Sequence, residues 1–168
     1  MKLQKLAAIT AGTLALVAVA SAADVRAPMR ATPPPPMGPG GITGPLPDLR
    51  PIASRILTGT VSIKNYGPGP AAASIATLVC QKQGAEPGGH CPEPGPIPEF
   101  TDPGYPNAVV VHVPALAAGH VYNLKLPFWA ALVWPSGDYD LTLTADAGTT
   151  VPETNEGNNT GVATKHVP

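Results

Sequence analysis

The residues of this chain best suited to chemistry are oxygen-bearing side chains close to the C-terminus. Carboxylates and amides are the hard oxygen donors that bind calcium, and several occur there within a short stretch. The candidate calcium ligands are Asp146, Glu153, Asn155, Glu156 and Asn158. Their spacing does not match an EF-hand loop, and Asn155, Asn158 and Asn159 can instead hold a tight turn by hydrogen bonds to backbone N–H groups. We therefore expect no cofactor, with calcium as the alternative.

The other reactive side chains lack a pattern that supports catalysis. The four histidines do not have metal-ligand spacing, and a zinc site built from Cys80, His90 and Cys91 would still need a fourth ligand. No serine of the predicted domain lies in a Gly-x-Ser-x-Gly turn. Asp138 and Asp140 share one face of a predicted strand, which suits acid–base chemistry but is more typical of a solvated face. The sequence therefore predicts a protein that is not an enzyme.

The two cysteines, Cys80 and Cys91, are expected to form a disulfide. The N-terminus has the parts of an export signal, as described below, and an exported protein folds in an oxidising environment, where pairing of its cysteines is the default. Closing so short a loop stabilises a fold by roughly 3 kcal/mol in the chain-entropy model. Free thiols or a metal site are the alternatives.

An apolar stretch at residues 128–135 contains both tryptophans of the chain. Its length and its final proline make it a poor helix and an interrupted strand. The tryptophans can fill the core, or they can form an exposed patch, since aromatic residues anchor many protein interfaces. Two aromatic residues of the preceding loop could extend such a patch. The candidate interaction surface is Trp129, Trp134, Phe100 and Tyr105.

Alternation of apolar and polar residues predicts the strands that would position these side chains. In the clearest case, Tyr139, Leu141 and Leu143 point to one face and the residues between them to the other. The expected strands are Leu46–Arg50, Arg55–Tyr66, Ala72–Gln81, Val109–Val113, His120–Phe128, Tyr139–Ala145 and Gly161–Val167. About seven short strands separated by Gly/Pro-rich turns predict an all-β fold, an antiparallel immunoglobulin-like β-sandwich, with an open barrel as the alternative.

The N-terminus has the parts of an export signal. Lys2 and Lys5 precede an apolar run from Leu6 to Val19, and Ala20-Ser21-Ala22 forms a small-x-small cleavage site. The run is short for a membrane span, so we expect no membrane insertion after cleavage. The expected division is a signal peptide at 1–22, a disordered Pro/Gly-rich linker at 23–45 and a domain at 46–168. The expected location is periplasmic or extracellular.

The charge balance argues against a nucleic-acid partner. Of 10 basic and 11 acidic residues, the predicted signal peptide removes Lys2 and Lys5, and the mature chain becomes acidic. No basic cluster occurs along the sequence. Because phosphate binding depends on concentrated Lys and Arg, nucleic acid is not an expected partner.

Four sequence blocks occur in an order that resembles a known family. They are Leu46-Pro47-Asp48-Leu49, the segment from Gly59 to Gly69, the segment from Val113 to Gly119, and Gly137-Asp138-Tyr139 with Asn155 to Asn159. Together they resemble the bacterial cell-adhesion-related domain CARDB, over roughly Leu46 to Val167. The resemblance implies an exported, non-catalytic immunoglobulin-like module for surface interaction. This chain departs from the family pattern in its long cysteine-containing loop after Gln81.

The expected function is therefore binding or structural support at the bacterial cell envelope, in adhesion or protein interaction. The partner is an unidentified protein or glycan. The alternative is a carbohydrate-binding accessory module, in which Trp129, Trp134 or Tyr105 would stack on sugars.

Overall fold

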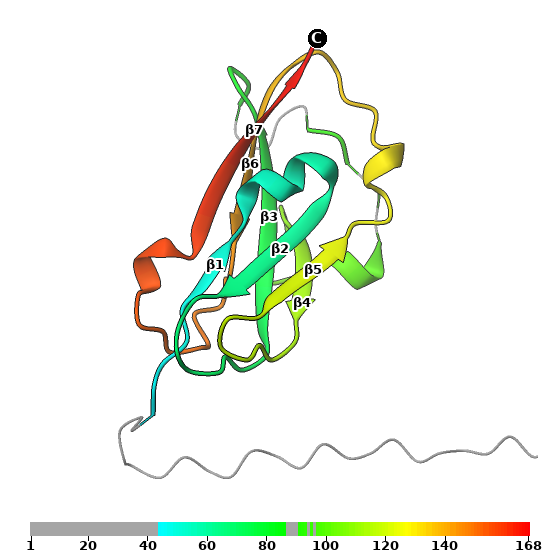
Figure 1. Ribbon diagram of the computed structural model, residues 1–168. Coiled ribbons are helices and arrows are strands. Elements are labelled where there is room, and N and C mark those ends of the chain that lie inside the picture. The colour runs from blue at the N-terminus through cyan, green and yellow to red at the C-terminus, as the bar shows by residue number, and fades with distance from the viewer. Residues whose placement is uncertain (1–43, 87–90, 94, 96) are drawn as a thin grey trace, which may run out of the picture. The chain divides into compact units, whose positions relative to one another are not determined.

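The alternating segments pair into strands in the computed structural model, which describes residues 44–86, 91–93, 95 and 97–168 (Figure 1). The strands are β1 (Leu49–Pro51), β2 (Thr60–Asn65), β3 (Ser74–Lys82), β4 (Val109–Val113), β5 (Val121–Lys125), β6 (Gly137–Thr144) and β7 (Thr160–Val167). Short 3-10 helices connect them: η1 (Ala53–Thr58), η2 (Pro98–Phe100), η3 (Trp129–Ala131) and η4 (Glu156–Asn158). The predicted signal peptide and nearly all of the predicted linker lie outside the described residues. Within the described residues, no helix has the length and apolar character needed to span a membrane.

The strands form two antiparallel sheets that face each other. One sheet has the order β1-β2-β5 and the other the order β4-β3-β6-β7. The chain crosses between the sheets after β2, returns after β4 and crosses again after β5. The predicted antiparallel immunoglobulin-like sandwich is therefore confirmed, and the alternative open barrel is not what the described strands form.

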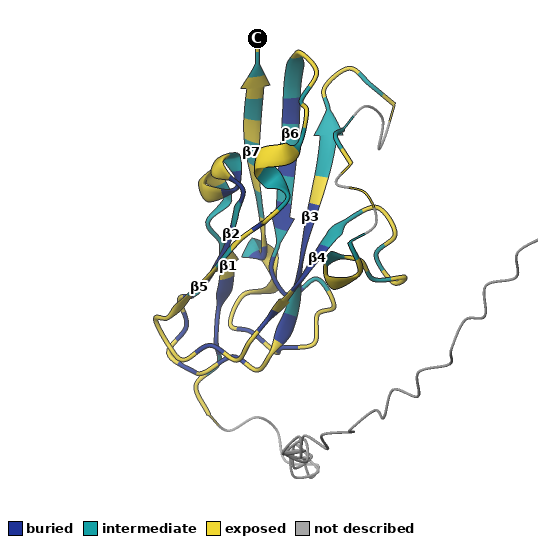
Figure 2. Cartoon of the chain, turned by 90° about the vertical axis from the view of Figure 1, so that its right-hand side faces the viewer, coloured by how far each residue is buried: buried dark blue, intermediate teal, exposed yellow. Residues whose placement is uncertain are grey.

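The core lies between the sheets, where the inward side chains of both layers meet. Figure 2 shows that strands of both sheets have buried segments. On β6, Tyr139, Leu141 and Leu143 are fully buried, as their alternation predicted. Val61 and Ile63 of β2 are fully buried as well. Period-two alternation places these residues on one face of each strand, so a local pattern in the sequence accounts for most of the core.

The structure corrects the second predicted strand, which was expected to begin at Arg55. Residues Ala53–Thr58 instead form the helix η1, and β2 begins only at Thr60. Gly59 ends the helix in the left-handed conformation, with φ 76°, which glycine adopts without steric cost. A Cβ at Gly59 would lie 2.1 Å from the Trp129 ring. Packing of this indole against the helix end is a tertiary contact that alternation does not reveal.

The first strand is also shorter and later than predicted, because the residues before it pair with loops. Strand β1 covers Leu49–Pro51. Ahead of it, the Leu46 carbonyl accepts a hydrogen bond from Gly69 N (3.1 Å), and the Pro47 carbonyl accepts one from Thr154 N (2.9 Å). These carbonyls are therefore committed to a turn and to the C-terminal loop.

The side chain of Asn65, at the end of β2, ties three separate segments together. Asn65 is fully buried. Its Oδ1 accepts hydrogen bonds from Asp48 N (3.1 Å) and Gly67 N (3.0 Å). Its Nδ2 donates to Gly69 O (2.8 Å) and Leu116 O (3.1 Å). All four hydrogen-bonding positions of the amide are used, and each partner is a backbone group of a different loop or turn position.

Two glycines let the backbone come close enough to Asn65 for this network to form. A Cβ at Gly69 would lie 1.7 Å from Pro45 O, and one at Gly67 would lie 2.4 Å from the Pro47 carbonyl carbon. Both distances are far inside van der Waals contact. The sequence Asn65-Tyr66-Gly67-Pro68-Gly69 is thus explained by close approach of the chain entering β1.

Replacement of Asn65 by alanine should destabilise the domain by roughly 3–5 kcal/mol, because several buried backbone groups lose their partner at once. Urea unfolding followed by circular dichroism measures the effect. Asn107→Ala is the control, since Asn107 is exposed in the loop before β4, and its cost should be below about 0.5 kcal/mol. Equal stability of the two variants would contradict the role given to Asn65.

Candidate functional site

The candidate calcium ligands lie in the loop between β6 and β7, and the first of them closes a turn. Asp146 follows β6, where its backbone turns away from the strand at φ 41°, and the residue is 1% exposed. Its Oδ2 accepts a hydrogen bond from Val151 N (2.8 Å), and its Oδ1 accepts one from Thr150 Oγ1 (2.9 Å). The carboxylate thus supplies the hydrogen-bond acceptor that the buried Val151 N–H group would otherwise find in water.

Glu153 connects this loop to the first strand. Its buried carboxylate accepts hydrogen bonds from Leu49 N and from Asn159 Nδ2, the latter at 2.9 Å. Burial raises the pKa of Glu153 above its ordinary value of 4.5, although these hydrogen bonds act in the opposite direction. The nearby Glu156, whose Oε1 accepts from Glu153 N (3.0 Å), also raises this pKa.

Asp48 binds the same loop from the other side. It accepts a hydrogen bond from Asn158 Nδ2 (3.0 Å) and forms an ion pair with Arg50, whose Nε lies 3.1 Å from both carboxylate oxygens. The hydrogen bonds from Arg50 hold the pKa of Asp48 below its ordinary value, with burial working against them. Together Asp48 and Glu153 join the start of the domain to its last loop.

This arrangement favours the structural interpretation of the acidic, Asn-rich loop. Asn155 Oδ1 accepts from Gly157 N (3.0 Å) and so forms the expected turn. Asn158 and Asn159 donate to carboxylates rather than to the backbone. Across the described residues, no group of three or more His, Cys, Asp or Glu could hold a metal ion. The oxygen donors stabilise the loop, and the calcium alternative stays a prediction, tested below.

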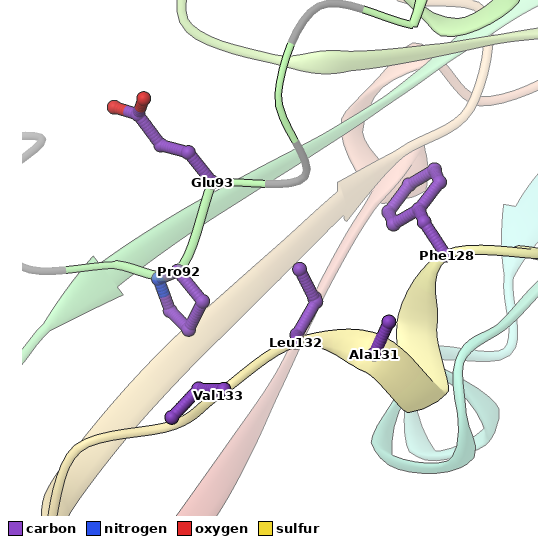
Figure 3. Close-up of a pocket in the computed structure, with 6 residues that line it drawn as sticks. All are labelled: Pro92, Glu93, Phe128, Ala131, Leu132 and Val133. Atoms are coloured by element: carbon purple, nitrogen blue, oxygen red, sulfur yellow. The ribbon is translucent and has the colours of Figure 1, made fainter.

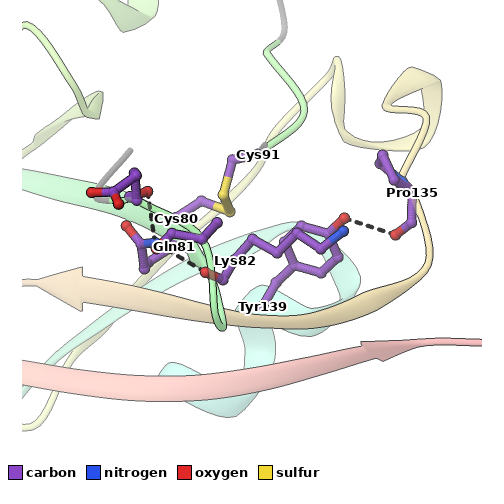
Figure 4. The surroundings of a disulfide bond; sticks show 8 residues. Cys80, Gln81, Lys82, Cys91, Pro135 and Tyr139 are labelled. Atoms are coloured by element: carbon purple, nitrogen blue, oxygen red, sulfur yellow. Dashed lines mark hydrogen bonds between the residues drawn. A yellow bond between two sulfur atoms is a disulfide. The ribbon is translucent and has the colours of Figure 1, made fainter. Parts of the chain in front are cut away.

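The expected disulfide is present and fixes one side of the long loop after β3 (Figure 4). Cys80 and Cys91 have Cα atoms 6.1 Å apart, and Cys80 packs against the core. The side-chain amide of Gln81 donates to the carbonyls of Ala85 and Glu86 (both 3.2 Å), which holds the start of the loop against β3.

The two tryptophans fill the end of the core. Their ring centroids are 5.3 Å apart, and Trp134 also meets Tyr139 edge-on at 5.1 Å. Tyr139 donates its hydroxyl to Pro135 O (2.7 Å), which fixes the end of the stretch (Figure 4). Both tryptophans are partly buried and pack against the core. The structure therefore favours core filling over the exposed aromatic patch.

The other two residues of the candidate interaction surface do not join the tryptophans in one patch. Phe100 packs edge-on against Phe128, with ring centroids 5.4 Å apart. Tyr105 instead lies near the loop after β6, where a Cβ at Gly148 would be 3.4 Å from its hydroxyl.

What the apolar stretch exposes is the segment between the tryptophans. Val133 is 83% exposed. With Leu132, Ala131 and Phe128 it lines a shallow hollow of about 290 Å³ closed on the other side by Pro92 and Glu93, next to Cys91 (Figure 3). Figure 3 shows the Glu93 carboxylate directed away from the hollow. Alternation does not find this surface, since it depends on how the disulfide-linked loop lies against residues 128–133.

The remaining candidate groups are dispersed or paired. His166 Nδ1 lies 2.7 Å from Asp138 Oδ1, and both are exposed to a large extent. Asp140 accepts hydrogen bonds from Thr164 Oγ1 (2.8 Å) and Gln83 Nε2 (3.0 Å). His166 and Thr164 are the cross-strand neighbours of Asp138 and Asp140, so these are contacts of a solvated face. His90 lies outside the described residues.

The family model for CARDB matches residues 101–163, from the loop before β4 into β7. The resemblance to CARDB is confirmed. The matched residues include the apolar stretch at 128–135, strand β6 and the Asn-rich loop, but not strands β1 to β3.

Two solved structures are similar to this chain. One is a domain of a candidate cell surface protein from Methanosarcina acetivorans, with 20% identity and a TM-score of 0.47, covering 73% of this chain and 93% of that one. The other is the CARDB domain of a Pyrococcus furiosus protein in complex with di-metal ions, with 16% identity and a TM-score of 0.38, covering 74% and 96%. No curated protein gives a match to this sequence.

The raised pKa of Glu153 predicts a pH-dependent difference between two variants. A carboxyl with a raised pKa in the folded state contributes stability that is present below 4.5, its ordinary value, and is lost as the pH rises through the folded pKa. Glu153→Gln cannot ionise, so its stability relative to the wild type should rise between about pH 4.5 and pH 7.

Urea unfolding at the two pH values measures this difference. Glu153→Ala serves as the comparison, because it leaves the buried Leu49 N–H without its acceptor and should cost about 1–3 kcal/mol. A constant gap between the wild type and the Gln variant at both pH values would show that Glu153 does not titrate as its burial requires.

Calcium should leave the melting temperature unchanged, because the carboxylates of the loop already accept hydrogen bonds from the protein. The measurement compares differential scanning calorimetry in millimolar calcium and in chelator. A site of micromolar affinity would stabilise the fold by a few kcal/mol through mass action, roughly RT ln(1 + [L]/Kd). A clear upward shift would restore the calcium alternative.

Proposed function

We propose that the chain is an exported, non-catalytic binding module of the bacterial cell envelope that holds a partner protein. The resemblance to CARDB supports an adhesion or interaction role, and the predicted signal peptide supports export. The observation that carries the proposal is the exposed apolar surface around Val133, beside the disulfide-linked loop. Exposed apolar surface of this kind is typical of contact sites.

A protein partner suits this surface better than a sugar. Stacking on a sugar needs an aromatic ring with a free face, whereas Trp129 and Trp134 contact each other and are partly buried. The hollow offers aliphatic side chains and one proline, which are typical of the apolar part of protein interfaces. Its volume of about 290 Å³ is also at the lower limit for small-molecule pockets.

Photo-crosslinking in the producing cell tests the proposal, with a photoreactive amino acid at position 133. This position is better than 129, because Trp129 packs against Gly59 and its replacement would disturb the fold. We expect one discrete adduct with an envelope protein, identifiable by mass spectrometry.

The matched control carries the same amino acid at position 162. Val162 is 58% exposed, on β7 of the four-stranded sheet, so it is an accessible valine outside the hollow. An adduct at 133 that is absent at 162 supports the proposal. No adduct at 133 from a correctly exported, folded protein would count against this surface.

A further inference from the structure

The outer face of the three-stranded sheet collects most of the basic side chains. The described residues include six Lys and Arg: Arg50, Arg55, Lys64, Lys82, Lys125 and Lys165. Four of them come from β1, β2, β5 and helix η1, and these elements contain no Asp or Glu. We call Arg50, Arg55, Lys64 and Lys125 the basic face.

The strand register places Arg50, Lys64 and Lys125 on the outer face of the sheet. Leu49, Val61 and Ile63 are fully buried in the core, so the residues between and beside them on the same strands point outward. Arg50 is paired with Lys64 across β1 and β2, and Thr60 is paired with Lys125 across β2 and β5. The charges therefore lie along one sheet surface.

Hydrogen bonds hold the remaining charges over this surface. Arg55 reaches from η1 to Asn123 Oδ1 (2.7 Å) and Ser62 Oγ (3.3 Å), which are cross-strand neighbours on β5 and β2. Lys125 Nζ donates to the Thr58 carbonyl of η1. Fixed positions reduce the conformational entropy lost when a ligand binds.

An exposed aromatic ring stands at the β1 end of the basic face. Tyr66 is 50% exposed. Lys64 Nζ lies 4.4 Å from its ring centroid, and the Arg50 guanidinium carbon lies 5.0 Å from it. These cation–π contacts hold two positive charges at a flat ring.

The positive charge of this face is only partly neutralised. Arg50 is paired with Asp48. Within the described part of the chain, Arg55, Lys64 and Lys125 form no ion pair with a carboxylate. Asp138 and Asp140 lie on β6 of the other sheet. A domain whose described residues are acidic in total therefore presents one basic surface, which attracts anions locally.

We propose that the basic face binds an acidic polysaccharide. The partner must be anionic to match three unpaired cations. A folded protein would need apolar anchors at the centre of its interface, yet the exposed large apolar or aromatic side chains here are Tyr66 and Val121, the latter only 38% exposed. Thr60 and Asn123 lie on the same face of the sheet as Lys64 and Lys125. Asn123 Oδ1 already accepts from Arg55, which leaves the Thr60 hydroxyl and the Asn123 NH2 group to suit sugar hydroxyls. The inference goes beyond the proposed function, since it concerns a different face and ligand.

Binding of the full-length mature protein to three polymers tests the inference. Polygalacturonate supplies carboxylates and dextran sulfate supplies sulfates, while neutral dextran is the uncharged control. We expect binding to at least one acidic polymer, weakening as salt rises, and none to neutral dextran. The Lys64→Gln, Lys125→Gln double variant should bind at least about tenfold more weakly.

The matched control is the Lys82→Gln, Lys165→Gln double variant, which removes the same charge from positions near Tyr139 and Trp134. Its affinity should stay within about twofold of the wild type, and melting temperatures verify that both variants are folded. Equal weakening in both variants, or no binding to either acidic polymer, would overturn the assignment.

Poly-L-glutamate and a short DNA duplex distinguish other anionic partners. Tighter binding to either one than to the acidic polysaccharides would reject the polysaccharide assignment. Sedimentation of the wild type at low salt should show a monomer. Self-association through the basic face would instead mean that a second copy of the chain is its partner, and would reject the assignment. The crosslinking result at position 133 is independent of all these outcomes.

Discussion

The hydrogen bonds of the Asn65 side-chain amide hold together the end of the sandwich where β2 ends and β1 begins. It joins the entry to β1, the turn after β2 and the β4–β5 connection through four hydrogen bonds to backbone groups. A buried amide left unpaired is costly, whereas a saturated one specifies a single arrangement of its neighbours. The two nearby glycines and the short first strand follow from this requirement for close backbone approach.

The acidic, Asn-rich loop makes a second connection between distant parts of the chain. Glu153 accepts a hydrogen bond from the Leu49 N–H, and Asn158 donates to Asp48. These contacts join residues more than a hundred positions apart, so the last loop helps to hold the edge strand β1. Four of the side chains that suggest a calcium site in the sequence, Asp146, Glu153, Asn155 and Glu156, are acceptors for protein N–H groups in the structure. With its ends joined in this way, the sandwich can hold the surfaces around Val133 and along the basic face in fixed positions.

Much of the fold could be predicted because strand alternation is local. Strand β4 was predicted with its observed bounds, and β6 and β7 within a few residues. Helix η1 was missed because Leu57 and Gly59 continue the alternation of β2 by coincidence. In the structure, Gly59 ends the helix in the left-handed conformation and packs against Trp129. The candidate site was predicted less well. The disulfide could be predicted because Cys80 and Cys91 are the two cysteines of the chain. The aromatic patch could not, because Phe100 and Tyr105 do not join the tryptophans.

The sequence by itself determined the class of fold, the inward faces of the main strands, the disulfide and the resemblance to CARDB. Each depends on spacing along the chain, and backbone geometry converts that spacing directly into position. Tertiary structure alone decided that Trp129 and Trp134 pack into the core, that Glu153 is buried against β1, and that Arg50, Arg55, Lys64 and Lys125 share one surface. No basic cluster exists along the chain, because these four side chains come from separate elements that meet only when β2 pairs with both β1 and β5.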